Sequence, residues 1–438
     1  MQYLPNLLFA IVLIIGLGFF VMNIKKLIRN IKLGKDVNRS DNQSARWKNM
    51  AKIALGQYKM VRRPVSGILH VVVYLGFIII NIEVLEIIID GLFGTHRVFS
   101  GVLGDGLYGF LIGTFEILAA LVFVAVVVFW WRRNIAQIKR FFNKEMKGWP
   151  KNDGNIILYF EMVLMSLFII MNAIDVPFQE AGIGNPISQF VAPWFSGFSP
   201  EALHTIEKGA WWIHIIGILI FLNYLYYSKH LHILLAFPNT FYAKLKPKGQ
   251  LDNLASVTSE VKMMMDPDAD PYAAPAEGAE DEVPEKFGAS DVTDLNWVQL
   301  MNAYTCTECG RCTSSCPANL TGKELSPRKI MMDTRDRLEE VGKNIDANGG
   351  TFVDDGKQLL NDYISPEELW ACTSCNACVQ ECPVNIDPLS IIMDMRRYLV
   401  MEESAAPQEL NMMMTNVENN GAPWQYSQMD RLNWKDEE

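Results

Sequence analysis

The sequence predicts an all-α protein with two unlike halves: a bundle of five membrane-spanning helices, followed by a smaller helical domain built around eight cysteines. Three observations support this prediction. Five long apolar stretches lie in the first half of the 438-residue chain, and all eight cysteines lie in the second half. Between the two groups of cysteines, Pro327 and Pro366 stand where helices would start and the NGG at 348–350 where one would end.

Each apolar stretch has about the length needed to cross a bilayer, roughly twenty helical residues. The stretches cover residues 5–23, 66–90, 107–131, 155–175 and 210–229. The third ends in a Trp pair followed by Arg132 and Arg133, which is typical of a membrane interface. The first has no basic segment before it and no small-residue cleavage site after it, so we expect a retained helix rather than a signal peptide.

Lysine and arginine predict the orientation of the bundle. They are concentrated in segments 24–65, 132–151 and 229–248, and they are almost absent from the other two loops. Since basic loops stay in the cytoplasm, we expect the N-terminus outside and everything after residue 229 in the cytoplasm. The sequence therefore predicts a multi-pass protein of the cytoplasmic (inner) membrane.

The net charge of −10 is concentrated between residues 252 and 294, where acidic residues, Pro and Ala dominate. Such a segment cannot bury enough apolar surface to fold, so we expect an acidic flexible linker over 246–294. An acidic docking patch for a basic partner is the alternative. The basic residues are accounted for by the membrane topology, so the composition does not support nucleic-acid binding.

The eight cysteines form two runs of identical spacing, C-x2-C-x2-C-x3-C-P. The runs are Cys306, Cys309, Cys312 and Cys316 before Pro317, and Cys372, Cys375, Cys378 and Cys382 before Pro383. In bacterial ferredoxins with this spacing, three thiolates of a run hold one [4Fe–4S] cluster and the fourth goes to the neighbouring cluster. We therefore predict two clusters, one on Cys306, Cys309, Cys312 and Cys382, and one on Cys372, Cys375, Cys378 and Cys316.

Zinc and disulfides are the alternatives for these cysteines. Zinc sites prefer paired C-x2-C knuckles with a longer spacer, and no cysteine is left over for a disulfide. Reduced thiols agree with a cytoplasmic location. The predicted domains are thus a transmembrane domain (1–245), the linker (246–294), a helical domain with two [4Fe–4S] clusters (295–403) and a C-terminal tail (404–438).

The histidines predict a second kind of cofactor. His70 lies near the cytoplasmic start of the second helix, and His214 and His232 lie on the fifth, eighteen residues apart. Eighteen residues make five turns, so these two share a face about 27 Å apart if the helix is unbroken. We expect His70 and His232, on different helices near the cytoplasmic side, to hold one haem b between them. Hydrogen-bonded packing is the alternative, but ionisable groups at this depth are costly and usually functional.

The outer end of the bundle lacks a matching pair. Nearer the outer end of the second helix, three positions share the face of His70. They are occupied by Asn81, Val84 and Ile88, and none of these is a good haem ligand. His214 is therefore expected to bind a second haem or a quinone. His96 and His204 fall in outer loops, and His230 is rotated away from His232 on the helix, so we expect it at the membrane interface.

Carboxyl groups within the spanning helices are candidates for the proton chemistry of a quinone site. Glu83 and Glu86 are the first candidates. Others lie in or at the ends of the helices: Glu116, Glu161 and Asp175. Polar pairing between helices is the alternative for any one of these acids.

At this point both halves resemble known families. The membrane half resembles the gamma subunit of respiratory nitrate reductase in its five helices and in its histidines, with His232 shortly before Pro238, although it lacks the second histidine of the second helix. The cysteine half resembles the helical ferredoxin subunit of heterodisulfide reductase and the iron–sulfur proteins of anaerobic glycerol-3-phosphate dehydrogenase. The matching stretches are CTECGRCTSSCP, TGKELSPRKIMM and WACTSCNACVQECPVNIDPLSIIMDMRRYLV.

The resemblances imply a fusion of a cytochrome b subunit with a helical ferredoxin subunit. Such a chain would be an oxidoreductase subunit that moves electrons between menaquinone or another quinone, haem b, two [4Fe–4S] clusters and a cytoplasmic redox partner. The chain has no adjacent Cys pair, so we expect the CCG repeats of heterodisulfide reductase-like enzymes, or a flavoprotein, on a separate polypeptide. Residues 418–434 resemble the segment before such repeats and are expected to dock it. The alternative is a membrane anchor or redox sensor with structural clusters.

Overall fold

The computed structural model describes residues 3–267 and 286–436, and in these ranges every regular element is a helix. Extended backbone pairs there only at two isolated bridges, one of which joins Lys35 to Asn296. The predicted all-α class is confirmed.

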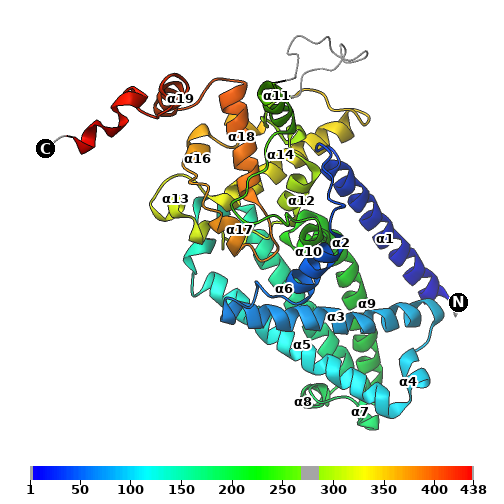
Figure 1. The fold of residues 1–438 in the computed structure, drawn as a ribbon. Helices are drawn as coiled ribbons and strands as arrows, with labels where there is room; N and C mark the ends of the chain where they lie inside the picture. The colour runs from blue at the N-terminus through cyan, green and yellow to red at the C-terminus, as the bar shows by residue number, and fades with distance from the viewer. Residues whose placement is uncertain (1–2, 268–285, 437–438) are drawn as a thin grey trace.

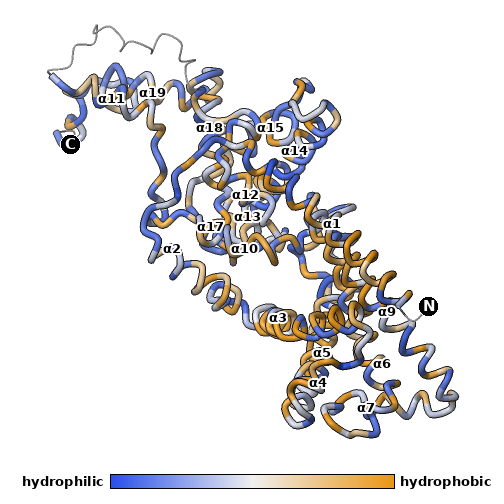
Figure 2. The backbone as a smooth tube through the Cα atoms, turned by 90° about the vertical axis from the view of Figure 1, so that its right-hand side faces the viewer, coloured by the Kyte–Doolittle hydropathy of each residue, from blue (hydrophilic) through white to orange (hydrophobic). Residues whose placement is uncertain are grey.

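Five helices are long and apolar enough to cross a membrane, which confirms the predicted number. They are α1 (Leu4–Ile31), α3 (Pro64–Phe93), α5 (Asp105–Asn134), α6 (Trp149–Ile174) and α9 (Pro200–Tyr224). Helix α6 packs on α5 and α9, while α3 packs on α5 and α1. Figure 2 shows the apolar residues gathered on these helices and the hydrophilic ones on the cysteine half.

Glycines let the spanning helices approach closely. At Gly76 a Cβ atom would lie 2.4 Å from Cγ2 of Val122, so α3 meets α5 there. At Gly91 it would lie 2.7 Å from the Phe9 ring, where α3 meets α1. Small residues at such crossings are how membrane helices gain van der Waals contact.

Short elements close the bundle at both ends. The end away from the cysteines carries α4 (Val98–Leu103), α7 (Val176–Ala181), α8 (Ser188–Val191) and a 3₁₀ turn (Ala192–Phe195) (Figure 1). The other end carries α2 (Gln43–Met50), a π-helical turn (Ala51–Leu55), two 3₁₀ turns (Lys139–Phe141 and Lys144–Met146) and α10 (His232–Phe241). The basic segments lie at the second end, beside the cysteine half.

The fifth spanning helix is broken before His232. Helix α9 ends at Tyr224, and two 3₁₀ turns (Leu225–Tyr227 and Lys229–Leu231) follow, separated by Ser228 in an extended conformation. The Ser228 hydroxyl accepts from the His230 N–H and starts the second turn. The expectation that His214 and His232 share one face of an unbroken helix is therefore wrong.

The cysteine half is a compact set of short helices around a long one. These are α12 (Trp297–Thr305), α13 (Pro317–Leu320), α14 (Pro327–Ala347), α15 (Leu359–Asp362), α16 (Pro366–Trp370), α17 (Ala377–Glu381) and α18 (Pro388–Met401). As predicted, α14 and α16 start at Pro327 and Pro366, each capped by the preceding serine hydroxyl. Helix α14 ends just before the NGG at 348–350.

Part of the predicted linker is folded. Helix α11 (Ala255–Met265) lies in it, and Ala289 and Val292 are buried in the core of the cysteine half, while residues 268–285 lie outside the described ranges. The packed part of that domain thus begins near residue 286. The tail forms α19 (Gln408–Asn420) and a 3₁₀ helix (Gln428–Lys435) that extend away from the core (Figure 1).

The two halves share one core. Leu27 of α1 and Leu231 pack in the same buried cluster as residues of α12, α14 and α18. Asn30 donates from Nδ2 to the Tyr304 hydroxyl over 2.9 Å, and both side chains are buried. The cysteine half is therefore held against the basic end of the bundle by packing as well as by charge.

Candidate iron–sulfur and membrane redox sites

The two cysteine loops have the same backbone shape. In the first, Glu308 and Gly310 have φ of 54° and 70°; in the second, Ser374 and Asn376 have φ of 55° and 59°. These positions stand two and four residues after the first cysteine of each run. At Gly310 a Cβ would lie 2.5 Å from Nη1 of Arg328, so glycine is required by space as well as by φ. Asparagine is among the side chains that tolerate this left-handed region.

The structure brings the eight thiols together in two sets. Cys306 and Cys312 lie within electrostatic range of Cys309 and Cys382, and Cys312 also lies within range of Cys378 in the second set. Cys372 and Cys378 lie within range of Cys316, and Cys372 also of Cys375. This is the grouping that cross-sharing between two [4Fe–4S] clusters requires, and the assignment of individual ligands stays a prediction.

Backbone N–H groups point at the thiols. The N–H of Ser374 donates to Sγ of Cys372 over 3.4 Å, and that of Ile386 donates to Sγ of Cys382 over 3.3 Å. Such bonds stabilise thiolates and tune cluster potentials. The residues present therefore fit iron–sulfur clusters.

The first set of thiols adjoins the membrane domain. Lys59, from the segment before α3, donates from Nζ to the Cys382 carbonyl over 3.1 Å and to the Val379 carbonyl over 3.2 Å. Arg311, inside the first cysteine loop, donates back to the Lys59 carbonyl over 3.1 Å. Burial lowers the pKa of Lys59 to about 8. In the second set, Cys375 is exposed to solvent.

Glu308 joins the first cysteine loop to the segment that follows the fifth spanning helix. Its carboxylate is buried and accepts from Nζ of Lys229 at 2.5 Å and from Nη1 of Arg335 at 2.8 Å. Burial alone would raise the pKa of Glu308, but the charges of Lys229 and Arg335 bring it below its ordinary value. Lys229 also lies 3.6 Å from Asp153 of α6. Sequence reasoning missed Lys229 and Glu308, because only the fold pairs them.

His70 and His232 face each other at this end of the bundle. Their ring centres lie 6.3 Å apart, with 42° between the ring planes. A metal–imidazole bond of about 2.0–2.1 Å, with the ring centre about 1.1 Å beyond the nitrogen, places two opposed axial rings about 6 Å apart. The spacing therefore fits two axial ligands of one metal atom.

The hydrogen bonds of the two rings also fit this role. Nδ1 of His232 lies 2.9 Å from the Lys229 carbonyl oxygen, and because a carbonyl only accepts, Nδ1 carries the proton and Nε2 keeps its lone pair. Nδ1 of His70 is buried without a partner. The pair fits a haem, and haem binding stays a prediction.

His230 differs from its predicted position. Its ring centre lies 5.6 Å from that of His232 and 5.6 Å from that of Phe221, and its Nδ1 is buried without a partner. The 3₁₀ turn around Lys229 changes the angle between neighbouring side chains, so the helical-wheel argument fails there. Three histidines, not two, meet beside the first cysteine loop.

His214 has no histidine partner among the ring contacts of the described residues. It is buried in α9, and its ring centre lies 6.5 Å from that of Phe168. Its Nδ1 has no partner. The buried free nitrogen fits either role predicted for His214, a second haem or a quinone.

A cavity of about 500 Å³ opens at the other end of the bundle. Glu83 and Glu86, the predicted quinone-site acids, both line it, together with apolar side chains that include Phe9, Trp211 and Trp212. Glu86 accepts from the Phe99 N–H over 2.9 Å, whereas Oε2 of Glu83 is buried without a partner.

Glu116 and Asp175 do not share this unpartnered state. Glu116 accepts from Nδ2 of Asn172 and from the N–H groups of Ile187 and Ser188, which indicates a structural role. Glu161 does not line the cavity, and Asp175 lies at its mouth. Polar pairing between elements therefore accounts for Glu116.

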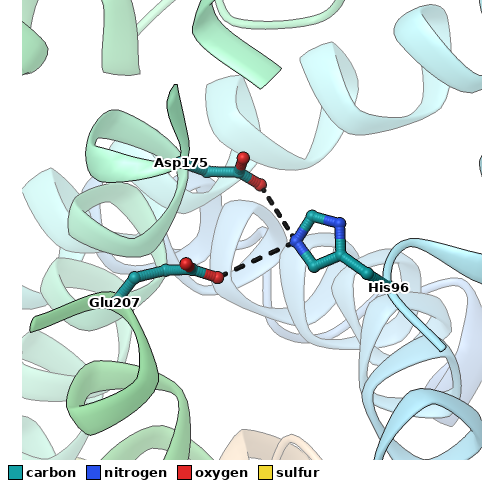
Figure 3. A group of neighbouring side chains, drawn as sticks. All are labelled: His96, Asp175 and Glu207. Carbon is teal, nitrogen blue, oxygen red and sulfur yellow. Dashed lines mark ion pairs between the residues drawn. The ribbon is translucent and has the colours of Figure 1, made fainter. Parts of the chain in front are cut away.

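The mouth of the cavity carries a group that sequence reasoning missed: His96, Asp175 and Glu207 (Figure 3). Nε2 of His96 lies 3.4 Å from Oδ2 of Asp175 and 3.8 Å from Oε1 of Glu207. Hydrogen bonds to Asp175 and Glu207 raise the pKa of His96 to about 9. Burial opposes ionisation of Asp175, but the bonds from His96 and Arg97 hold the pKa of Asp175 well below its ordinary value. The only sequence signal was a His-Arg pair in a loop otherwise poor in basic residues.

Residues 305–386, which contain both cysteine runs, match the family described as the 4Fe-4S dicluster domain. A 4Fe–4S domain is present. It confirms the prediction of an iron–sulfur domain and disfavours zinc and disulfides at these cysteines. No solved structure matches the chain.

Curated relatives extend the similarity beyond the dicluster domain. The chain is 30% identical to the probable iron-sulfur-binding oxidoreductase FadF of Bacillus subtilis (strain 168), over 98% of the chain and 61% of FadF. It is 25% identical to the EtfAB:quinone oxidoreductase of Syntrophomonas wolfei, over 98% of the chain and 59% of that protein. The chain thus spans about three fifths of the length of these relatives.

The dicluster domain also has shorter relatives. One subunit of the ferredoxin/F(420)H(2)-dependent CoB-CoM heterodisulfide reductase of Methanosarcina acetivorans is 33% identical over 25% of this chain and 53% of its own length. This confirms the resemblance of the cysteine half to a heterodisulfide reductase subunit. The resemblance of the membrane half to the nitrate reductase gamma subunit stays a prediction.

Proposed function

We propose that the chain is the electron-transfer subunit of a membrane-bound quinone oxidoreductase and works between the quinone pool and a soluble redox partner. The observation that carries this proposal is the junction between the histidine pair and the first cysteine loop. Arg311, within that loop, donates to the carbonyl of Lys59, which lies just before α3, the helix that carries His70. Lys229 bonds Glu308 of the same loop through its side chain and His232 through its carbonyl.

The residues fit the groups that the proposal requires. When bound, two [4Fe–4S] clusters and a haem b supply one-electron transfer. The two cysteine sets would hold the clusters, and His70 and His232 the haem. The protein's own contribution is to fix the first cysteine loop against the membrane bundle, through the bonds of Lys59, Lys229 and Arg311.

The quinone head group is proposed to bind in the cavity at the other end of the bundle. Its volume of about 500 Å³ lies within the range of about 300–1,000 Å³ usual for small-molecule sites. Trp211, Trp212 and Phe9 offer an apolar wall, and Glu83 and Glu86 can take or give protons. His214 lies about one helical turn from Trp211 and does not line the cavity itself; we propose that it holds a second haem or acts on the quinone from beside the cavity.

The soluble partner is proposed to dock on the cysteine half, in the cytoplasm. The thiol that is exposed there is Cys375. The tail carries exposed apolar side chains that such a partner could cover: Trp424, Tyr426, Met429, Leu432 and Trp434. The name of the Syntrophomonas relative, EtfAB:quinone oxidoreductase, favours a flavoprotein as this partner, while a protein with CCG repeats stays the alternative.

A quinol titration tests this function. The purified, cofactor-loaded protein would be mixed anaerobically with a water-soluble menaquinol analogue while the haem and iron–sulfur absorption is followed. We expect reduction of both chromophores in the native protein and loss of that reduction in His70→Ala. His204→Ala, which removes an exposed histidine at the outer end, is the control and should behave as the native protein. Full cofactor content without any reduction by quinol would support the anchor or sensor alternative instead.

A further inference from the structure

We propose that His96, Asp175 and Glu207 form a binding site for a divalent transition-metal ion of the zinc class, at the mouth of the outer cavity. The three side chains come from separate parts of the bundle: the loop after α3, the end of α6 and the second turn of α9. Figure 3 shows the His96 ring opposite the two carboxylates, with one ring nitrogen facing both. One ligand atom of each lies within 4.8 Å of the others.

The distances match those between ligands of one tetrahedral ion. Two ligand atoms with bonds of about 2.0–2.2 Å to a tetrahedral zinc lie about 3.3–3.5 Å apart. Nε2 of His96 is 3.4 Å from Oδ2 of Asp175, and its 3.8 Å distance to Oε1 of Glu207 needs only a small movement of a half-exposed ring. One imidazole and two carboxylates are a usual donor set for zinc, with the fourth position left to water.

Neighbouring groups orient the ligands. The Phe178 N–H donates to Oδ1 of Asp175 over 3.2 Å, and Nε of Arg97 donates to Oδ2 over 2.8 Å. These bonds fix the carboxylate and leave a lone pair of Oδ2 for an ion, as outer partners of metal ligands commonly do. Glu207 also has His204 beside it, with Nδ1 3.4 Å from Oε2.

The cavity behind the site attracts cations. Five carboxyl side chains line it, against the basic Arg97, Lys208 and His96. Among them Glu83 is only 6% exposed, and its Oε2 has no partner, although buried carboxyl oxygens are normally bonded. This independent observation points to a positive or proton-donating group inside the cavity. The 54% exposure of the His96 side chain leaves the ion a route from the surface.

An ion at this mouth would separate Glu83 and Glu86 from outside water. If quinone chemistry takes place in the cavity, bound zinc would slow that chemistry by blocking proton exchange with water. This slowing by zinc is the one consequence that rests on the proposed function. Metal binding itself does not depend on it. Without an ion, a protonated His96 is simply held between two carboxylates.

Zinc titration of the cluster-loaded protein tests the proposal. Isothermal calorimetry with Zn²⁺, after removal of trace metal with a chelator, should give one saturable site per chain. We expect affinity to fall more than about tenfold in His96→Asn and in Glu207→Gln, since loss of a ligand should cost more than loss of an orienting partner. Glu201→Gln is the matched control, because it removes the same charge from the first turn of the same helix.

Zinc-edge X-ray absorption separates this site from the cysteines. Nitrogen and oxygen ligands give bonds of about 2.0–2.2 Å, whereas cysteine gives about 2.3 Å. The proposal is overturned by the absence of a saturable site, by sulfur ligation, or by affinity that is unchanged in both variants. Thermal unfolding of each variant verifies that it is folded. Quinol-linked reduction of the native protein in metal-free buffer tests the proposed function without the ion, so failure of this site and failure of the proposed function have different signatures.

Discussion

Single residues fix the junction between the two halves, and Lys229 is the most connected of them. Its ammonium is buried against Glu308 and Asp153, and its carbonyl holds the His232 ring. Removing one partner of a buried ion pair leaves the other charge uncompensated, which costs more than the pair contributes. The structure therefore predicts that this residue matters for stability far more than surface lysines do.

Lys229→Met should lower the free energy of unfolding by about 2–3 kcal/mol. The effect should be smaller than for a buried carboxylate left with no partner, because Arg335 still bonds Glu308. Chemical denaturation in detergent measures the change. Lys26→Met is the control, since its bridge to Asp346 is partly exposed and should contribute less than about 1 kcal/mol. Equal losses in the two variants would contradict the buried role of Lys229.

Gly310 is required by the shape of the first cysteine loop. Gly310→Ala should drive a methyl group into Arg328 and prevent assembly of one cluster, so that iron falls from about eight to about four atoms per chain. Gly322→Ala is the matched control: it also has a positive φ, of 84°, but open space around it. Iron analysis of the two proteins distinguishes crowding from backbone strain, and equal iron contents would refute the crowding argument.

At the scale of elements, close helix crossings organise the membrane bundle. Gly76 lets α3 approach α5, while Gly209 of α9 has open space around it. Gly76→Leu should therefore separate two helices and lower stability by about 1–3 kcal/mol. Thermal unfolding in detergent measures this, with Gly209→Leu as the control, which should unfold close to the native temperature. If Gly209→Leu alone lost much stability, the close crossing of α3 and α5 would not be what limits the stability of the bundle.

The sequence predicted elements whose cause is local and missed those whose cause is tertiary. Apolar length determined the five spans, and the prolines at 327 and 366 marked helix starts because proline is suited to the first turn. The break at Ser228 was missed, since it depends on Asp153 accepting from the Lys229 N–H. The burial of Ala289 and Val292 was also missed, because composition alone suggested a linker there.

In the candidate site, too, the sequence predicted features with a local cause and missed those with a tertiary cause. Cysteine spacing is a local signal, and it predicted the iron–sulfur domain that the family match confirms. The proximity of His70 and His232 was anticipated from their shared depth in the membrane. The separate expectation that His214 and His232 share one face of an unbroken helix was wrong. The group of His96, Asp175 and Glu207 could not be foreseen, because it joins three segments that no spacing relates.

At the scale of the whole molecule, loops at the basic end of the bundle hold the cysteine half against it. Arg328 of α14 is fully buried and bonds Glu145, from the loop between α5 and α6, at 2.7 Å. Glu145 also accepts from the Ser326 hydroxyl over 2.7 Å. The bundle thus supports the start of α14, which lies just after the first cysteine run.

Glu145→Ala should loosen this contact while leaving the spanning helices intact. We expect faster amide hydrogen exchange over residues 306–330, with exchange in α3 and α6 unchanged, because an unpaired buried Arg328 favours local opening. Lys144→Ala is the control, as that side chain is 94% exposed. Exchange that rises everywhere, or nowhere, would contradict a specific lock.

The central claim is that a haem ligand pair in the membrane adjoins two iron–sulfur sets, and cofactor content tests it most directly. Haem, iron and acid-labile sulfide per chain would be measured on the purified protein and on His70→Ala, with dithionite-reduced minus oxidised spectra. The account predicts about eight non-haem irons in both proteins, as two cubane clusters require, and a b-type haem signal that His70→Ala loses. A native protein without haem, or a haem signal unchanged in His70→Ala, would contradict it.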